Sequence, residues 1–192
     1  TKYTGDSDLS DIDFEIKQMR QLGEIIGYIN SLGDFDGFGG LICNDKNIIS
    51  QNLTWQDTLL NILDNVDEPL HSNISMKNIT KERIADLDES NILPYLSHGD
   101  IKRFSNVMVD HRENIDSLVD WQNAWISDSL TEFLFTRMFR FTPHYSGKKV
   151  DALTEGYLSK VPNSVKQLTD EQATVSLSVA LLMLYDRDDY QE

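Results

Sequence analysis

Apolar side chains recur at intervals of three and four residues over residues 11–31, the spacing of one face of an α-helix. The members of this stripe are Ile12, Ile16, Met19, Leu22, Ile26 and Ile29. Four glycines between Gly33 and Gly40 end the pattern. Residues 41–50 then hold two short apolar runs around Asn44-Asp45-Lys46-Asn47, for which a β-hairpin and a helix remain alternatives.

A second apolar stripe starts near Thr54 and Asp57, which resemble a helix cap, and ends before Pro69. The polar stretch 70–78 predicts a loop. Short helices are expected over residues 80–87 and 89–96, the second with Pro94 in its first turn.

The stretch 100–141 contains neither glycine nor proline, and its apolar residues keep helical spacing. This pattern predicts one helix over 101–110 and a long one over 113–140. A short helix is expected over 150–158. The run Thr169-Asp170-Glu171-Gln172 has the pattern of a capping box, so a further apolar helix is expected from there to about Tyr185.

These elements predict an all-α or nearly all-α fold. We expect a single-domain orthogonal bundle of six to eight helices, with at most a minor β-hairpin near residues 41–50. Residues 1–10 are assigned to a flexible N-terminal segment and residues 11–192 to one acidic domain.

The net charge of the chain excludes more classes of function than its length does. The 192 residues include 32 Asp or Glu and 17 Lys or Arg, so the formal net charge is −15. Such a field repels phosphate backbones and anionic lipids, which argues against direct binding to nucleic acid or to a membrane surface. Cys43 is the only cysteine, which excludes an intrachain disulfide. No apolar run reaches the length of a membrane span, and we expect a cytoplasmic protein.

The glycine-rich stretch after the first helix partly matches a calcium-binding loop. Asp34 and Asp36 fit the first two ligand positions, and Gly39 fits the turn. Phe38 stands where an oxygen ligand is required, and Asp45 replaces the usual glutamate. A calcium-binding module using Asp34 and Asp36 is the least favoured of three functional hypotheses.

Four carboxylates recur at helical intervals in the segment 110–120. On one helix, Asp110, Glu113, Asp116 and Asp120 would share a face and repel one another, and a divalent cation would offset that repulsion. A neighbouring short helix would add Glu82 and Asp86. This favours a magnesium-dependent nucleotide or phosphate hydrolase as the alternative hypothesis. Its catalytic residues would be Glu113, Asp116 and Asp120, and its metal ligands Glu82, Asp86, Glu113 and Asp116. Ordinary solvated helix faces explain the same pattern.

Aromatic side chains crowd the predicted long helix on a second face. This surplus, typical of protein interfaces, comprises Trp121, Phe135 and Phe139 together with Arg140. A central helix covered on both sides explains it equally well. The leading hypothesis is a non-enzymatic acidic binding module, such as an inhibitor, an immunity-type factor or an assembly subunit, that engages a basic protein partner and needs no cofactor.

Overall fold

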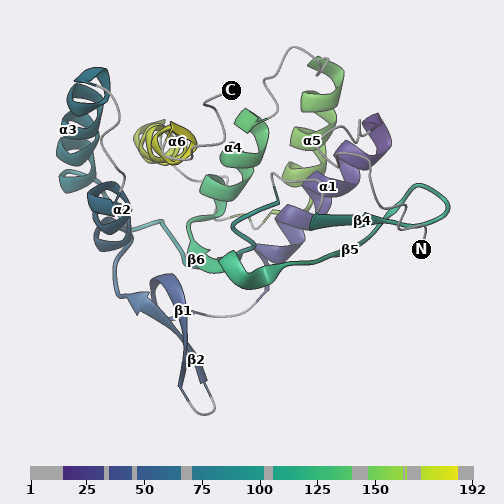
Figure 1. Cartoon of the computed structure of the whole chain (residues 1–192), viewed down its shortest axis with the longest axis horizontal. Helices are drawn as coiled ribbons and strands as arrows, with labels where there is room; N and C mark the ends of the chain where they lie inside the picture. The colour runs from purple at the N-terminus through teal and green to yellow at the C-terminus, as the bar shows by residue number, and fades with distance from the viewer. Residues whose placement is uncertain are drawn as a thin grey trace.

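The computed structural model describes residues 15–32, 35–44, 47–65, 71–101, 106–139, 147–161, 163 and 170–185. Within these ranges, the chain forms six α-helices and six β-strands (Figure 1). The fold is therefore mixed α/β, and the prediction of an all-α bundle is wrong.

A four-stranded antiparallel sheet joins segments that are far apart in sequence. Its strands, in the order β2-β1-β6-β3, are β2 (Asn47–Asn52), β1 (Phe38–Asn44), β6 (Trp125–Ser127) and β3 (Tyr95–Ser97). The β1–β2 hairpin confirms one of the two alternatives for residues 41–50, and Ile42 pairs with Ile49 across it. Gly39, at φ +93°, and Gly40 let β1 pair with β6. The hairpin extends from the body of the protein (Figure 1).

A second sheet contradicts the predicted helix over 101–110 and the first part of the one over 113–140, whereas the last part of the latter is helical. It contains only β4 (Val107–Val109) and β5 (Ile115–Leu118), joined by the turn 110–114. In this turn Asp110 Oδ1 accepts the N–H groups of Arg112 and Asn114 at 2.8 and 2.9 Å, a local bonding pattern that competes with helix formation. Helix α4 (Ser129–Phe139) starts only after β6.

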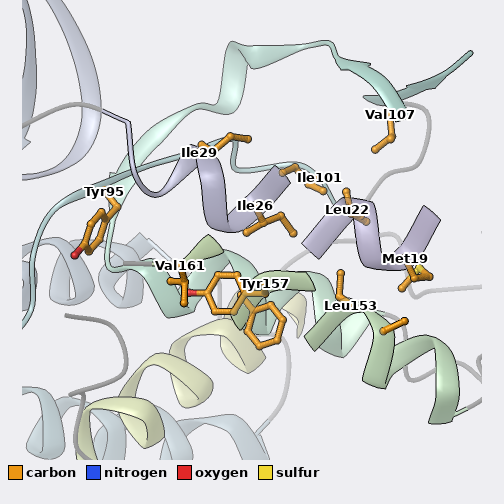
Figure 2. Close-up of a cluster of buried hydrophobic side chains, with 12 residues drawn as sticks. Met19, Leu22, Ile26, Ile29, Tyr95, Ile101, Val107, Leu153, Tyr157 and Val161 are labelled. Carbon is orange, nitrogen blue, oxygen red and sulfur yellow. The ribbon is translucent and has the colours of Figure 1, made fainter. Parts of the chain in front are cut away.

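Helix α1 (Ile16–Ile29) packs closely against α5 (Gly147–Lys160). Glycines allow their backbones to meet, since a Cβ built on Gly23 would lie 2.0 Å from the carbonyl oxygen of Leu153. Both helices were predicted, although residues 11–14 of the first lie outside the described ranges. Figure 2 shows the centre of one core, which is formed by the labelled residues of α1 and α5 and by Val161: Met19, Leu22, Ile26, Ile29, Leu153, Tyr157 and Val161.

Helix α6 (Asp170–Tyr185) contacts α2 (Trp55–Asn65), α3 (His71–Ala85) and α4. Helices α2 and α6 confirm the predictions for these regions, although Thr169 of the capping box lies outside the described residues. Helix α3 contradicts the predicted loop at 70–78. The prediction failed because this helix carries no apolar stripe. The predicted helix over 89–96 is wrong as well. Pro94 restricts the residue before it to extended backbone, and β3 follows.

The segment between β3 and β4 is held by its buried ends. Ile101 and Val107 both lie in the α1–α5 core (Figure 2). This fixes the two ends of a loop whose residues 102–105 lie outside the described ranges. Among the described helices, none is long and apolar enough to cross a membrane.

Candidate functional site at a junction of two loops

His98 connects the loop after β3 to the loop after β5. Its ring is buried, and Nε2 lies 2.9 Å from the carbonyl oxygen of Val119 while Nδ1 lies 3.3 Å from the backbone nitrogen of Asp100. A neutral imidazole with its proton on Nε2 satisfies both contacts, because Nε2 then donates and Nδ1 accepts. Burial lowers the pKa of His98, which favours this neutral form. His98 is therefore a cross-link between two loops.

Gly99 allows these two loops to touch. It has φ +80°, and a Cβ built on it would lie 2.1 Å from the carbonyl oxygen of Asn123. Asn123 ends the short 3-10 helix η3 (Trp121–Asn123). The ring of Trp121 packs on His98 with centroids 4.5 Å apart. A larger residue than glycine would separate the segments.

Asn106 ties the far end of the first loop to both Asp100 and Val119. Its Nδ2 donates to the backbone oxygen of Asp100 at 3.0 Å and to Oδ2 of the same residue at 3.3 Å. Its backbone oxygen accepts the N–H of Val119 at 3.0 Å. Asp100 and Asn106 are each only 6% exposed. Asp100, Asn106 and the Val119–Asp120 segment thus lie together, and we call this set, with His98 and Gly99, the loop junction.

Asp120 occupies a backbone conformation that side-chain-bearing residues rarely adopt, with φ 64° and ψ 61°. Its side chain is exposed, and its charge, like that of Asp100, opposes the lowering of the His98 pKa. Strained backbone of this kind concentrates at functional sites, where surrounding contacts hold it in place. Here those contacts are the two backbone hydrogen bonds of Val119, the residue before Asp120. Its carbonyl oxygen is bonded to the His98 ring, and its N–H donates to the backbone oxygen of Asn106.

Two buried carboxylates lie at the start of α4, and one of them, Glu132, bonds to the junction. Glu132 of α4 accepts the backbone N–H groups of His98 at 2.9 Å and Gly99 at 2.8 Å. Asp128 accepts the N–H of Thr131 at 2.8 Å and the hydroxyl of Ser176 from α6. Burial raises the pKa of Asp128 and raises that of Glu132 to about 7. Helix α4 therefore holds the loop through Glu132, whereas Asp128 connects the start of α4 to α6.

The donor set of the junction suits a divalent cation that is shared with phosphate. Mg²⁺ prefers oxygen ligands and is usually held by one or two carboxylates together with substrate phosphates. Asp120 offers a carboxylate, and Asn106 carries an amide oxygen besides the Nδ2 group that donates to Asp100. Among the described residues, no group of three or more His, Cys, Asp or Glu side chains could hold a metal ion without such help.

The carboxylate face predicted from residues 110–120 does not exist, because these residues belong to a hairpin and not to a helix. Glu113 and Asp116 are exposed on the β4–β5 hairpin, and only Asp120 reaches the loop junction. Glu82 and Asp86 are exposed at the end of α3. The helical arrangement on which the predicted magnesium site depends is therefore wrong.

The other predicted site residues are scattered. Asp36 is exposed and precedes a strand, whereas the calcium-loop hypothesis expects a helix after the loop; Asp34 lies outside the described residues. Trp121 is 40% exposed and packs on His98 of the loop junction. Phe135 and Phe139 lie in α4, but the structure does not describe their side chains, and Arg140 lies outside the described residues. The basic partner remains an untested prediction.

The fold has relatives among solved structures, although no protein-family model and no curated protein matches the sequence. The macrolide 2′-phosphotransferase MphH from Brachybacterium faecium superposes with a TM-score of 0.51 at 14% sequence identity. The superposition covers 93% of this chain and 55% of the MphH chain. The choline kinase LicA from Streptococcus pneumoniae gives 0.54 at 14% identity, with coverages of 92% and 57%. A thermostable mutant of the aminoglycoside phosphotransferase APH(4)-Ia gives 0.50 at 19% identity, with coverages of 94% and 69%.

These likenesses show the fold, which is that of kinase-like phosphotransferases and not an all-α bundle. The chain spans a little over half the length of the first two structures. The leading hypothesis of a non-enzymatic binding module is contradicted, because all three neighbours are named as enzymes that transfer phosphoryl groups.

One sequence signal for the junction was available and was missed. Protein kinases carry a catalytic loop of the form H-R-D-x-x-x-x-N, in which the Asp is the base and the Asn a magnesium ligand. His98-Gly99-Asp100 followed by Asn106 resembles this loop with one additional residue before the Asn. Asp120 follows β5, and kinases likewise carry a magnesium-binding aspartate, that of the D-F-G motif, after their catalytic loop.

Proposed function

We propose that this chain carries the catalytic loop and the metal-binding aspartate of a kinase-like phosphotransferase that uses ATP to phosphorylate a hydroxyl group. The observation that carries the proposal is the loop junction itself. Hydrogen bonds of His98 and Asn106 bring Asp100 and Asp120 to one place although the two aspartates are twenty positions apart in the sequence.

Each member of the junction has a distinct role in this proposal. The carboxylate of Asp100 accepts the proton of the acceptor hydroxyl while that oxygen forms a bond to the γ-phosphorus and the bond from phosphorus to the β-phosphate oxygen breaks. Asn106 orients Asp100 by donating to Oδ2. Asp120 and Asn106 would hold Mg²⁺, whose chemistry is to offset charge on the phosphates.

The loop departs from the kinase pattern by one residue, and the structure accommodates the difference. Five residues separate Asp100 from Asn106, where the kinase pattern has four. The bonds between these two side chains form nevertheless. Ile101 and Val107, on either side of residues 102–105, both lie in the core.

The acceptor class is proposed from charge and from the neighbours. A macrolide, choline and an aminoglycoside are named for the three similar structures, and a chain with a formal net charge of −15 attracts cationic molecules. We therefore propose a small cationic alcohol as the acceptor and the cytoplasm, where ATP is supplied, as the location. The chain contains no G-x-G-x-x-G motif, so the proposal concerns the catalytic and metal-binding loops.

The proposal is tested with the full natural polypeptide that carries this chain, Mg-ATP and a panel of amino alcohols and aminoglycosides. Phosphoryl transfer to each acceptor is monitored by ³¹P NMR. Asp100→Asn should lower the transfer rate by about 10²–10⁴-fold, because it removes the base. Asp116→Asn is the matched control, since it makes the same chemical change at an exposed position on β5. No transfer to any acceptor, or equal rates for the two variants, would refute the assignment.

A further inference from the structure

The four-stranded sheet has one covered edge and one open edge. At the β3 edge the strand is three residues long, and Pro94 precedes it. Asn30, which follows α1, covers this edge by donating from Nδ2 to the backbone oxygen of Leu96 at 3.1 Å. At the opposite edge β2 runs for six residues, and among the described residues no further strand lies beyond it. Every second residue of an edge strand directs its N–H and C=O groups away from the sheet, so those of β2 can pair with another strand.

The outer part of the β1–β2 hairpin is a ribbon of two strands. Among the described residues, β1 pairs with β6 through Gly39 and Gly40 alone, so residues 41–44 and 47–50 pair with each other outside the main sheet. The hairpin extends from the body of the protein (Figure 1). A two-stranded ribbon is marginally stable in water and gains stability from additional strands. The hairpin therefore has both a free edge and a physical reason to use it.

Apolar side chains lie exposed on this hairpin. Ile42 and Ile49 are register partners, so their side chains lie next to each other on one face. They are 45% and 46% exposed, and Leu53, directly after β2, is 82% exposed. An added strand at the β2 edge would lie beside Ile49 and remove part of this apolar surface from water.

β2 also lacks the features that keep the sheet edges of separate molecules apart. Charged side chains, proline, bulges and very short length are the usual ones. The sequence of β2 contains neither a charge nor a proline. The one irregularity in the register of the hairpin places its extra residue in β1, between Phe38 and Leu41. Nothing in β2 itself therefore opposes pairing with another strand.

The charge distribution favours a second copy of this chain as the occupant. Residues 37–56 contain one acidic and one basic residue, Asp45 and Lys46, whereas the whole chain has a formal net charge of −15. Two copies of so acidic a chain repel each other wherever their carboxylates meet, and this neutral segment avoids that repulsion. A basic partner, in contrast, finds no carboxylate on β2 with which to pair.

We propose that β2 pairs antiparallel with β2 of a second copy of this chain, with Ile49 of one copy opposite Ile49 of the other. A two-fold axis then relates the copies, so the same strand serves both sides and the contact closes as a dimer. This register continues the row of isoleucines across four strands, in the order Ile42, Ile49, Ile49, Ile42. The neighbouring pairs are Ser50 with Ile48 and Gln51 with Asn47, so no like charges face each other.

The first test is sedimentation velocity of the full natural polypeptide between about 1 and about 100 μM, where dimers of micromolar affinity dissociate. The wild type should sediment as a dimer at the upper end of this range. Ile49→Lys should raise the dissociation constant of the dimer by at least about a hundredfold, because two lysines then face each other at the axis.

Ile79→Lys is the matched control. It makes the same change, with the same gain of one positive charge, at an isoleucine of α3 that is 51% exposed. This variant should dimerise like the wild type. A wild type that is monomeric over the whole range, or equal dissociation constants for the two variants, would overturn the proposal.

Hydrogen–deuterium exchange locates the contact. The amides of residues 47–52 should exchange more slowly at about 100 μM than at about 1 μM, and Ile49→Lys should abolish this difference. A monomer in which these amides are protected at both concentrations would show that another part of the natural polypeptide covers β2. A dimer in which their exchange does not depend on concentration would use another surface. Either result would overturn the proposal. Neither measurement requires turnover, so the dimer is tested independently of the proposed phosphoryl transfer.

Discussion

The β4–β5 turn and the loop junction both carry carboxylates, but they differ in burial and in the range of their contacts. In the turn, Asp110 accepts N–H groups two and four residues along the chain, and Glu113 and Asp116 are exposed. In the junction, Asp100 is buried and is bonded through Asn106 to the strand that precedes Asp120. The hydrogen bonds of the turn are made within the turn itself, whereas those of the junction are made between segments that are distant in sequence.

This difference shows why carboxylate density along the chain was a poor guide to chemistry. Like charges at close spacing are tolerated where water screens them, and the turn is such a place. Buried polar groups must instead be bonded to partners, and the partners here come from the loops after β3 and β5 and from α4. Buried polar groups, whose desolvation costs the most free energy, are therefore better candidates for function than exposed carboxylates.

The largest expected effect on stability comes from Gly99. Gly99→Ala should lower the free energy of unfolding by about 3 kcal/mol, because the new Cβ meets a carbonyl oxygen and the left-handed backbone disfavours side chains. Urea denaturation measures this loss. Gly147→Ala is the control, since nothing lies within 4 Å of a Cβ there. Equal midpoints for the two variants would show that the loops do not touch as described.

A smaller effect on stability is expected at Glu113. This residue shares its left-handed backbone conformation with Asp120. Glu113→Gly should raise the free energy of unfolding by about 0.5–1 kcal/mol, because glycine relieves the strain and the exposed side chain makes no bond that the turn requires. Thermal unfolding detects this gain. Phosphoryl transfer by this variant should match the wild type, and a loss of activity would place the turn within the functional site.

Several helices could be predicted from the sequence because each has an apolar stripe that packs into a core. The stripes of α1 and α2 are of this kind, and both enter the buried clusters. The strands within 95–127 could not be predicted, because β3, β4 and β6 are only three residues long and show no resolvable alternation. Their apolar residues coincided with helical spacing, and tertiary pairing determined the structure instead.

The candidate site depends on contacts that sequence spacing does not encode. His98 meets Val119 across 21 positions and Glu132 across 34. Asp120 was named from the sequence, but for a helical face that does not form. The pattern of His98, Asp100 and Asn106 was visible in the sequence, and only the convergence of the three with Asp120 makes it specific.

The most direct test of the loop junction is the affinity of the full natural polypeptide for Mn-ATP, measured by isothermal titration calorimetry. If Asp120 holds the cation that nucleotide phosphates share, Asp120→Asn should weaken binding by at least about tenfold, while Asp116→Asn, four residues earlier, should leave it unchanged. Equal affinities for the wild type and both variants would contradict the account, because the strained aspartate of the junction would then have no part in binding.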